Sequence, residues 1–254
     1  MIYALLSGLC AFLGITGGIG GSTLLRPLLD AISPLEPAAI AVLCTTGTLS
    51  TALVCAFFSL NRPIALHQDE LTLLAIGAAL GGALGDLIGA RFFAMLPARG
   101  ALLLQNGLLF TLLAFPTVYS SGLSGSIVPM SITRMAALPV ALILGIAASF
   151  LSFGAVPLTL MIYRLLFDAS EDEGTIAALA IALCAMAGKM IVLLIRLRLN
   201  LPNADILLWL LPGTLLGALP AMIPSVQRGL RHIGTPLLYL SLYTALINAA
   251  AAFA

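Results

Sequence analysis

The sequence predicts an all-α polytopic membrane protein, and three observations carry that prediction. Hydrophobic residues make up 61% of the 254-residue chain and charged residues 8%, whereas an ordinary soluble domain has roughly 25% charged residues. The mean hydropathy of the chain is +1.15. Residues 38–60 contain no charge, and about 20 apolar residues are enough for one helical span of a bilayer.

Hydropathy and helix breakers divide the chain into about 8 hydrophobic elements. The elements of the first half are a broken one at 3–29 and helices near 38–60, 71–96 and 101–119. A Ser/Gly/Pro-rich stretch at 120–129 marks the middle of the chain. The elements of the second half are a broken one at 138–166 and helices near 174–195, 204–224 and 236–253. We therefore predict two transmembrane repeats, 1–125 and 126–254, which form one domain together.

Glycine interrupts the first element of each half. The interruptions fall at Gly17, Gly18, Gly20 and Gly21 and, with a single glycine, at Gly154. A helix break frees backbone N–H and C=O groups, which are tolerated at membrane depth only where protein or a polar cavity satisfies them. Matching breaks in two halves are typical of a transporter binding site. Each broken element either crosses the bilayer, giving parallel repeats, or forms a re-entrant hairpin, giving inverted ones.

The two halves also share spaced residues. Arg26 and Asp30 recur as Arg164 and Asp168, about 138 positions later, and Cys44 has a counterpart in Cys184. The third elements share glycines four residues apart: Gly81 and Gly85, then Gly213 and Gly217. Such small-xxx-small patterns let helix backbones approach closely in lipid. We expect these third-element glycines to serve packing.

Composition and motifs exclude several classes of protein. The formal net charge of +1 gives no basic surface for nucleic acid. Nothing indicates an enzyme, since His67 and His232 fall in connections and neither a GxSxG nor an HExxH motif is present. The cysteines lack metal-ligand spacing. We therefore expect no enzymatic activity, no cofactor and no metal, and the partners are the lipid bilayer and a small solute.

The first apolar segment is expected to be a retained membrane element. The chain begins Met1-Ile2-Tyr3 without a basic residue, whereas a secretory signal has a basic region before its apolar core.

Two stretches of the chain resemble a known family. They are GITGGIGGSTLLRPLLDAISPLEPAAIAVLCTTGTLS, residues 14–50, and GGALGDLIGARFFAMLPARGALLLQNGLLF, residues 81–110. The first has a glycine cluster, a proline about six residues later and a Thr pair on the next helix. The second has a glycine-rich run, an arginine and a Leu-Pro connection. Both are similar to the sulfite exporter TauE/SafE family, also called the toluene-sulfonate uptake permeases, and the order of elements agrees over nearly the whole chain.

This resemblance implies a secondary transporter in a plasma membrane or bacterial inner membrane. Its solutes would be small sulfur-containing anions such as sulfite, sulfonates or thiosulfate. No Walker A motif is present, which is consistent with transport without ATP. Carboxylates or another small solute remain an alternative. The sequence leaves open the direction of transport, the coupling ion and the membrane orientation, and glycine-rich faces are compatible with a homodimer.

The broken elements supply the first candidate site. Half-helix N-termini favour an anion through their free N–H groups and their dipole. We therefore expect the backbone at Gly17, Gly18, Gly20 and Gly21, the hydroxyls of Ser22 and Thr23, and Gly154 to contact substrate. The alternative is a close helix crossing that needs small side chains.

Lys189 is the most unusual ionisable residue, because it lies well inside an apolar run. A lysine at mid-helix costs roughly 2.5–3.5 kcal/mol on insertion, so such residues are mostly functional or paired. We expect Lys189 to bind the anion, or else to snorkel or to pair with Asp86.

Arg26 and Arg164 follow the two breaks, and a planar guanidinium suits a sulfonate or sulfite. Both are candidate substrate ligands, although anchoring at the membrane surface is the favoured interpretation. Thr45 and Thr46 match the family's Thr-Ser pair and are candidate ligands on that ground. Their hydroxyls alternatively bond their own i−4 carbonyls.

Asp86 stands among glycines and has two interpretations: a carrier of a coupling proton, or the structural partner of Arg91. The structural pair is preferred. A thiol relay between Cys44 and Cys184 is less favoured than a role as small core residues.

Overall fold

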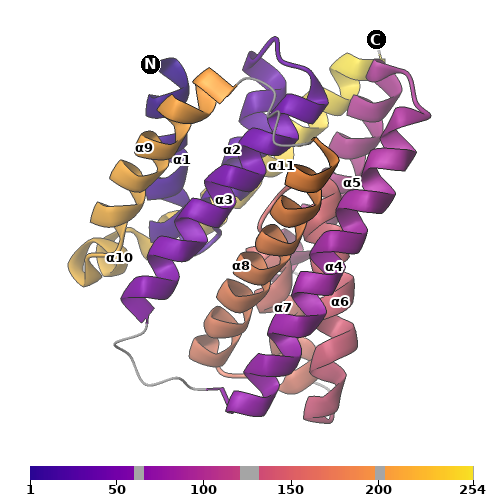
Figure 1. Cartoon of the computed structure of the whole chain (residues 1–254). Helices are drawn as coiled ribbons and strands as arrows, with labels where there is room; N and C mark the ends of the chain where they lie inside the picture. Colours follow the sequence, from indigo (N-terminus) through magenta and orange to yellow (C-terminus); the bar gives the residue numbers. More distant parts are fainter. Residues whose placement is uncertain (60–65, 121–131, 198–203, 254) are drawn as a thin grey trace.

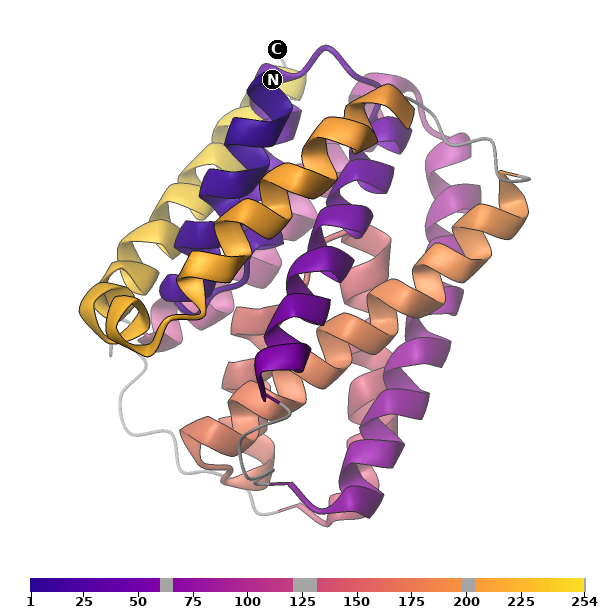
Figure 2. The same ribbon diagram turned by 60° about the vertical axis from the view of Figure 1, so that its left-hand side comes forward.

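The computed structural model describes residues 1–59, 66–120, 132–197 and 204–253, and these residues form helices and no strand (Figures 1 and 2). The elements are α1 Ile2–Thr16, α2 Gly21–Ile32, α3 Pro37–Ser59, α4 Gln68–Ala94, α5 Ala98–Ser120, η1 Arg134–Ala136, α6 Ala137–Leu151, α7 Val156–Phe167, α8 Glu171–Arg196, α9 Ala204–Ala221, α10 Pro224–Leu230, η2 Arg231–Ile233 and α11 Gly234–Phe253. The expected boundary between residues 125 and 126 lies outside the described residues.

Six helical segments are long and apolar enough to cross a membrane. They are Pro37–Ser59, Gln68–Ala94, Arg99–Tyr119, Arg134–Leu151, Glu171–Arg196 and Pro224–Phe253. Large apolar side chains such as Leu9, Phe57 and Leu216 are exposed on the outside of the bundle, where lipid replaces water as the solvent. The chain is therefore a membrane-embedded all-α protein. The expected span at 204–224 is shorter, because α9 ends at Ala221 and the separate helix α10 follows.

α1 and α2 form a helical hairpin around the glycine cluster. α1 ends at Thr16, and Gly18 and Gly20 take φ angles of 70° and 80°, a conformation that side chains other than glycine rarely tolerate. The carbonyl oxygen of Gly14 accepts the N–H groups of Ile19 and Gly20, each at 2.9 Å. At the far ends of the two helices the hydroxyls of Tyr3 and Ser33 lie 3.2 Å apart. The start of α1 and the end of α2 therefore share one face of the molecule.

The second interruption, between α6 and α7, has a different backbone. Its left-handed residues are Ser152 and Ala155, with φ angles of 55° and 48°, and Gly154 is not left-handed. Space at Gly154 is tight, since a Cβ there would lie 3.0 Å from Ser22 Oγ and that hydroxyl would have to shift. The N–H of Ile132 donates to Leu166 O at 2.9 Å, so the entry into α6 and the end of α7 also share a face.

Those two faces are opposite ends of the bundle. We call the end with Tyr3, Ser33, Glu36, Leu96 and Leu197 the terminal face, because both chain termini lie there (Figure 1). The end with Glu70, Arg134, Arg164, Glu171 and Arg231 is the opposite face. α8 runs from Glu171 at the opposite face to Arg196 at the terminal face. The α1–α2 hairpin thus enters from the terminal face, and α6 and α7 enter from the opposite face.

Glycine stripes bring the helices into close contact. Gly77, Gly81 and Gly85 of α4 lie against backbone carbonyls of α6, so a Cβ at any of them would overlap α6. Gly213 and Gly217 of α9 lie in the same way against α1. The small-xxx-small glycines therefore serve helix packing, as expected. Figure 1 shows α1 and α9 side by side.

Candidate functional site

A cavity of about 510 Å³ extends from the terminal face into the bundle. Its outer rim includes Glu36, Leu96 and Leu197, and its inner part includes Ser152 and Lys189. Lys189 lies seven residues before the end of α8, which places its Cα about 10 Å along the helix from that end. The cavity therefore reaches the interruption between α6 and α7 from one face of the membrane.

Lys189 is 3% exposed and caps the end of α6. Its Nζ donates to the carbonyl oxygen of Ser149 and to Ser152 Oγ, the latter at 2.6 Å. Because the last carbonyls of a helix carry the negative end of its dipole, they stabilise a buried ammonium there. A truncated side chain would lose both of these hydrogen bonds.

Asp86 of α4 faces the cations of α8. Its Oδ1 lies 3.9 Å from Lys189 Nζ, and its Oδ2 lies 3.1 Å from Arg196 Nη2. Asp86 and Lys189 are buried, whereas the Arg196 side chain is 42% exposed. The pairing expected between Asp86 and Arg91 is therefore corrected: the partners of this carboxylate come from α8. The alternative pairing of Lys189 with Asp86 is present.

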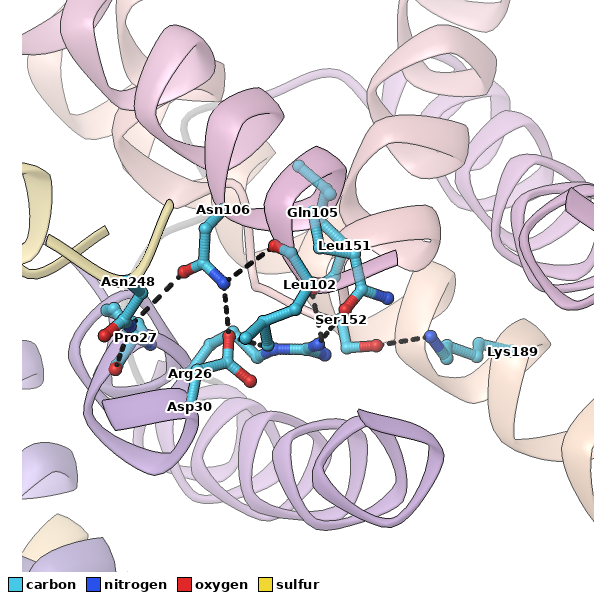
Figure 3. A network of polar contacts seen from close by, with 10 residues as sticks. All are labelled: Arg26, Pro27, Asp30, Leu102, Gln105, Asn106, Leu151, Ser152, Lys189 and Asn248. Carbon is cyan, nitrogen blue, oxygen red and sulfur yellow. Dashed lines mark hydrogen bonds and ion pairs between the residues drawn. The ribbon is translucent and has the colours of Figure 1, made fainter. Parts of the chain in front are cut away.

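Arg26 is 1% exposed and lies behind the cavity wall. Its Nε donates to Asp30 Oδ2 at 3.1 Å, its Nη2 to Gln105 Oε1 at 2.7 Å, and its Nη1 more weakly to Leu151 O at 3.5 Å. Figure 3 shows Ser152 between Arg26 and Lys189. The preferred interpretation of Arg26 as an anchor at the membrane surface is wrong, because its guanidinium is buried.

Two asparagines extend this network across α2, α5 and α11. Asn106 Nδ2 donates to Asp30 Oδ2 at 3.3 Å, and Asn248 Nδ2 donates to Pro27 O at 2.8 Å (Figure 3). Asn248 also donates to Asn106 Oδ1 at 3.4 Å. Buried amides of this kind fix the relative positions of the helices that carry them. The network therefore fastens α2 to α5 and α11.

The two interruptions touch each other. The N–H of Gly154 donates to Ser22 Oγ at 2.8 Å, and a Cβ on Gly20 would lie 3.0 Å from Val156 Cγ2. The N-terminal ends of α2 and α7 consequently meet inside the bundle. Thr23 does not point its hydroxyl at a ligand site, since Thr23 Oγ1 donates to Ile19 O at 2.8 Å.

Other predicted site residues lie away from the cavity. Gly17 packs against Gly234, Gly18 has open space at its Cβ position, and Gly21 lies against Ala11. These three glycines serve the turn and the packing of the hairpin.

The remaining polar candidates have local partners. Thr45 and Thr46 donate to the i−4 carbonyls of Ala41 and Val42, at 2.7 and 2.9 Å, which is the alternative considered for them. Arg164 lies on the opposite face with a 40% exposed side chain, 3.4 Å from Glu171. Among the predicted site residues, Lys189 lines the cavity and Arg26 reaches its wall through Gln105.

Sequence reasoning missed several residues of this region. Ser149, Ser152, Gln105 and Arg196 line the cavity. The adjacent pair Gln105-Asn106 within an apolar run was an available signal, because polar residues in membrane helices tend to face the bundle interior. Asp30 was recognisable too, since it follows Arg26 by four residues on one helix face.

Groups that could hold a metal ion are absent from the described part of the chain, where no three His, Cys, Asp or Glu side chains cluster. Cys10, Cys44, Cys55 and Cys184 are free thiols. Comparison with protein-family models, with curated proteins and with solved structures gives no match.

Proposed function

We propose that this chain is a secondary transporter, in a plasma membrane or bacterial inner membrane, that moves small sulfur-containing anions such as sulfite, sulfonates or thiosulfate. The observation that carries the proposal is the cavity that leads from the terminal face to the buried Lys189 beside the interruption of α6 and α7. A cavity of about 510 Å³ falls within the range of roughly 300–1,000 Å³ that small-molecule sites occupy.

The donors that line the cavity suit an oxyanion. An anion that leaves water must exchange its hydration for fixed donors and positive charge. Lys189 and Arg196 supply that charge, and the Ser152 hydroxyl and the Gln105 amide supply neutral donors. Sulfur anions are proposed as the class because of the resemblance of residues 14–50 and 81–110 to the sulfite exporter family.

Two inverted repeats are part of the proposal. Several contacts between helices occur in matching pairs if α1–α2 corresponds to α6–α7, α3 to α8, α4 to α9 and α5 to α11. Under that correspondence the α4–α6 contact of one half is equivalent to the α9–α1 contact of the other. The α3–α8 contact and the α5–α11 contact each join two helices that correspond to each other. The two interrupted elements enter from opposite faces, which favours inverted over parallel repeats.

Inverted repeats provide a physical route to alternating access. Two halves of similar structure can exchange roles, so that a cavity at one face closes while its counterpart opens at the other. The Ser22–Gly154 contact, where the two interruptions meet, lies at the centre of such a rearrangement.

The test is the thermal stability of the detergent-purified protein with thiosulfate, sulfite, sulfoacetate and size-matched carboxylates. A solute that binds only the native state raises the unfolding midpoint. At a solute concentration of one hundred times its dissociation constant, it adds about 2.7 kcal/mol to the free energy of unfolding. We expect the sulfur anions to raise the midpoint. A rise with carboxylates alone would overturn the proposed substrate class, and no rise with any anion would overturn the anion site.

A further inference from the structure

Asp86 occupies the place where an anion would bind. Its carboxylate lies within 3.9 Å of Lys189 Nζ and 3.1 Å of Arg196 Nη2, and all three residues line the cavity. Gly82 and Gly85 on the same helix bring the α4 backbone against α8 and α6. Close packing therefore holds this carboxylate, 5% exposed, between two cations.

The charges around Asp86 come from a small set of elements. α8 contributes Lys189 and Arg196, whereas α6, which packs on the other side of α4, has no ionisable side chain. α5 contributes the neutral Gln105 to the cavity, and Glu36 lies at the rim before α3. On α4 itself Arg91 follows five residues later. Asp86 is thus the carboxylate that pairs with the cavity's two cations when no ligand is present.

A solute anion and an ionised Asp86 would compete for the same cations. Two negative charges a few ångströms apart repel each other strongly when they are away from bulk water. The repulsion between the bound anion and the Asp86 carboxylate is removed most directly if the carboxylate takes up a proton. Protonation of the Asp86 carboxyl would release Lys189 and Arg196 to the incoming anion.

We propose that Asp86 is an internal competitor of the transported anion and takes up one proton when that anion binds, so that anion and proton move together. This inference rests on the proposed function. The proton comes from water in the cavity at the face where the anion enters. It returns to water at the other face once the anion has left and the carboxylate pairs again with Lys189.

The experiment measures equilibrium binding of radiolabelled thiosulfate to the purified protein between pH 6 and pH 8. Thiosulfate does not titrate in this range, so any pH dependence belongs to the protein. One linked proton predicts an affinity that falls about tenfold per pH unit wherever Asp86 is ionised in the free protein and protonated in the complex. Asp86→Asn should bind thiosulfate with an affinity independent of pH, and Glu36→Gln, which removes the other cavity carboxyl, should keep the dependence.

Asp86→Asn leaves Lys189 and Arg196 without their counter-charge, and a second variant is used if this prevents folding. Asp86→Asn combined with Arg196→Gln keeps the charge balance of the cavity and should also bind without pH dependence. A flat wild-type affinity, or a pH dependence that survives loss of Asp86, would overturn the coupling while leaving the anion site intact. Absence of thiosulfate binding by the folded wild type at every pH would overturn both proposals for this anion.

Discussion

The backbone N–H of Gly154 donates a 2.8 Å hydrogen bond to Ser22 Oγ, joining two interrupted helical elements from different halves of the chain. Both residues are buried. A buried N–H needs an acceptor, and the residues of the interruption have no helical partner to offer. The Ser22 hydroxyl oxygen therefore accepts the hydrogen bond that a backbone carbonyl oxygen would accept inside a helix.

Ser22→Ala is expected to lower the free energy of unfolding by about 1–3 kcal/mol, because it leaves the Gly154 N–H unsatisfied in the interior. The measurement is the unfolding midpoint in detergent. Ser50→Ala is the matched control, since Ser50 Oγ donates only within its own helix, to Thr46 O. Equal midpoints for the two variants would contradict a structural role for the contact between the interruptions.

Gly82→Ala is expected to destabilise the protein by about 1–3 kcal/mol through overpacking. A Cβ on Gly82 would overlap the carbonyl oxygen of Ala185, so α4 and α8 would have to separate. Gly107→Ala in α5 provides the comparison, because a Cβ there meets nothing within 4 Å and alanine favours a helix by about 1 kcal/mol. The two midpoints should move in opposite directions, and a stabilised Gly82→Ala would refute the close crossing.

Asp30→Asn is expected to lower the free energy of unfolding by about 3–5 kcal/mol, because it leaves the buried guanidinium of Arg26 without its counter-charge. Asp168→Asn tests the corresponding place in the second half. Asp168 is exposed in a left-handed conformation, which asparagine adopts readily, so we expect almost no change. Chemical or thermal unfolding in detergent distinguishes the two, and similar losses would argue against the buried pair.

The helical architecture was largely predictable because hydropathy reports it directly. The expected helix at 38–60 corresponds to Pro37–Ser59, and the one at 174–195 to Glu171–Arg196. The backbone of the second interruption was not predictable, since the left-handed residues there are Ser152 and Ala155 rather than glycine. Tertiary contacts, including the lysine that caps α6, hold those residues in a conformation that their own preferences oppose.

The candidate site was predictable only in part. Lys189 was identifiable because a charge in an apolar run is costly. The sequence did not show that Arg26 is buried and Arg164 partly exposed, because the two arginines have the same spacing in the two halves. Burial is decided by the partners. Asp30 and Gln105 accept hydrogen bonds from Arg26 inside the bundle, whereas Arg164 pairs with the exposed Glu171.

The most direct measurement is uptake of radiolabelled thiosulfate into proteoliposomes by the wild type, by Lys189→Gln and by Arg164→Gln. Loss of the Lys189 charge removes the cation at the inner end of the cavity, and Arg164 lies on the opposite face outside it. We predict saturable uptake by the wild type and by Arg164→Gln, and a decrease of at least about tenfold for Lys189→Gln, equivalent to about 1.4 kcal/mol. Uptake by folded Lys189→Gln at the wild-type rate would contradict the account.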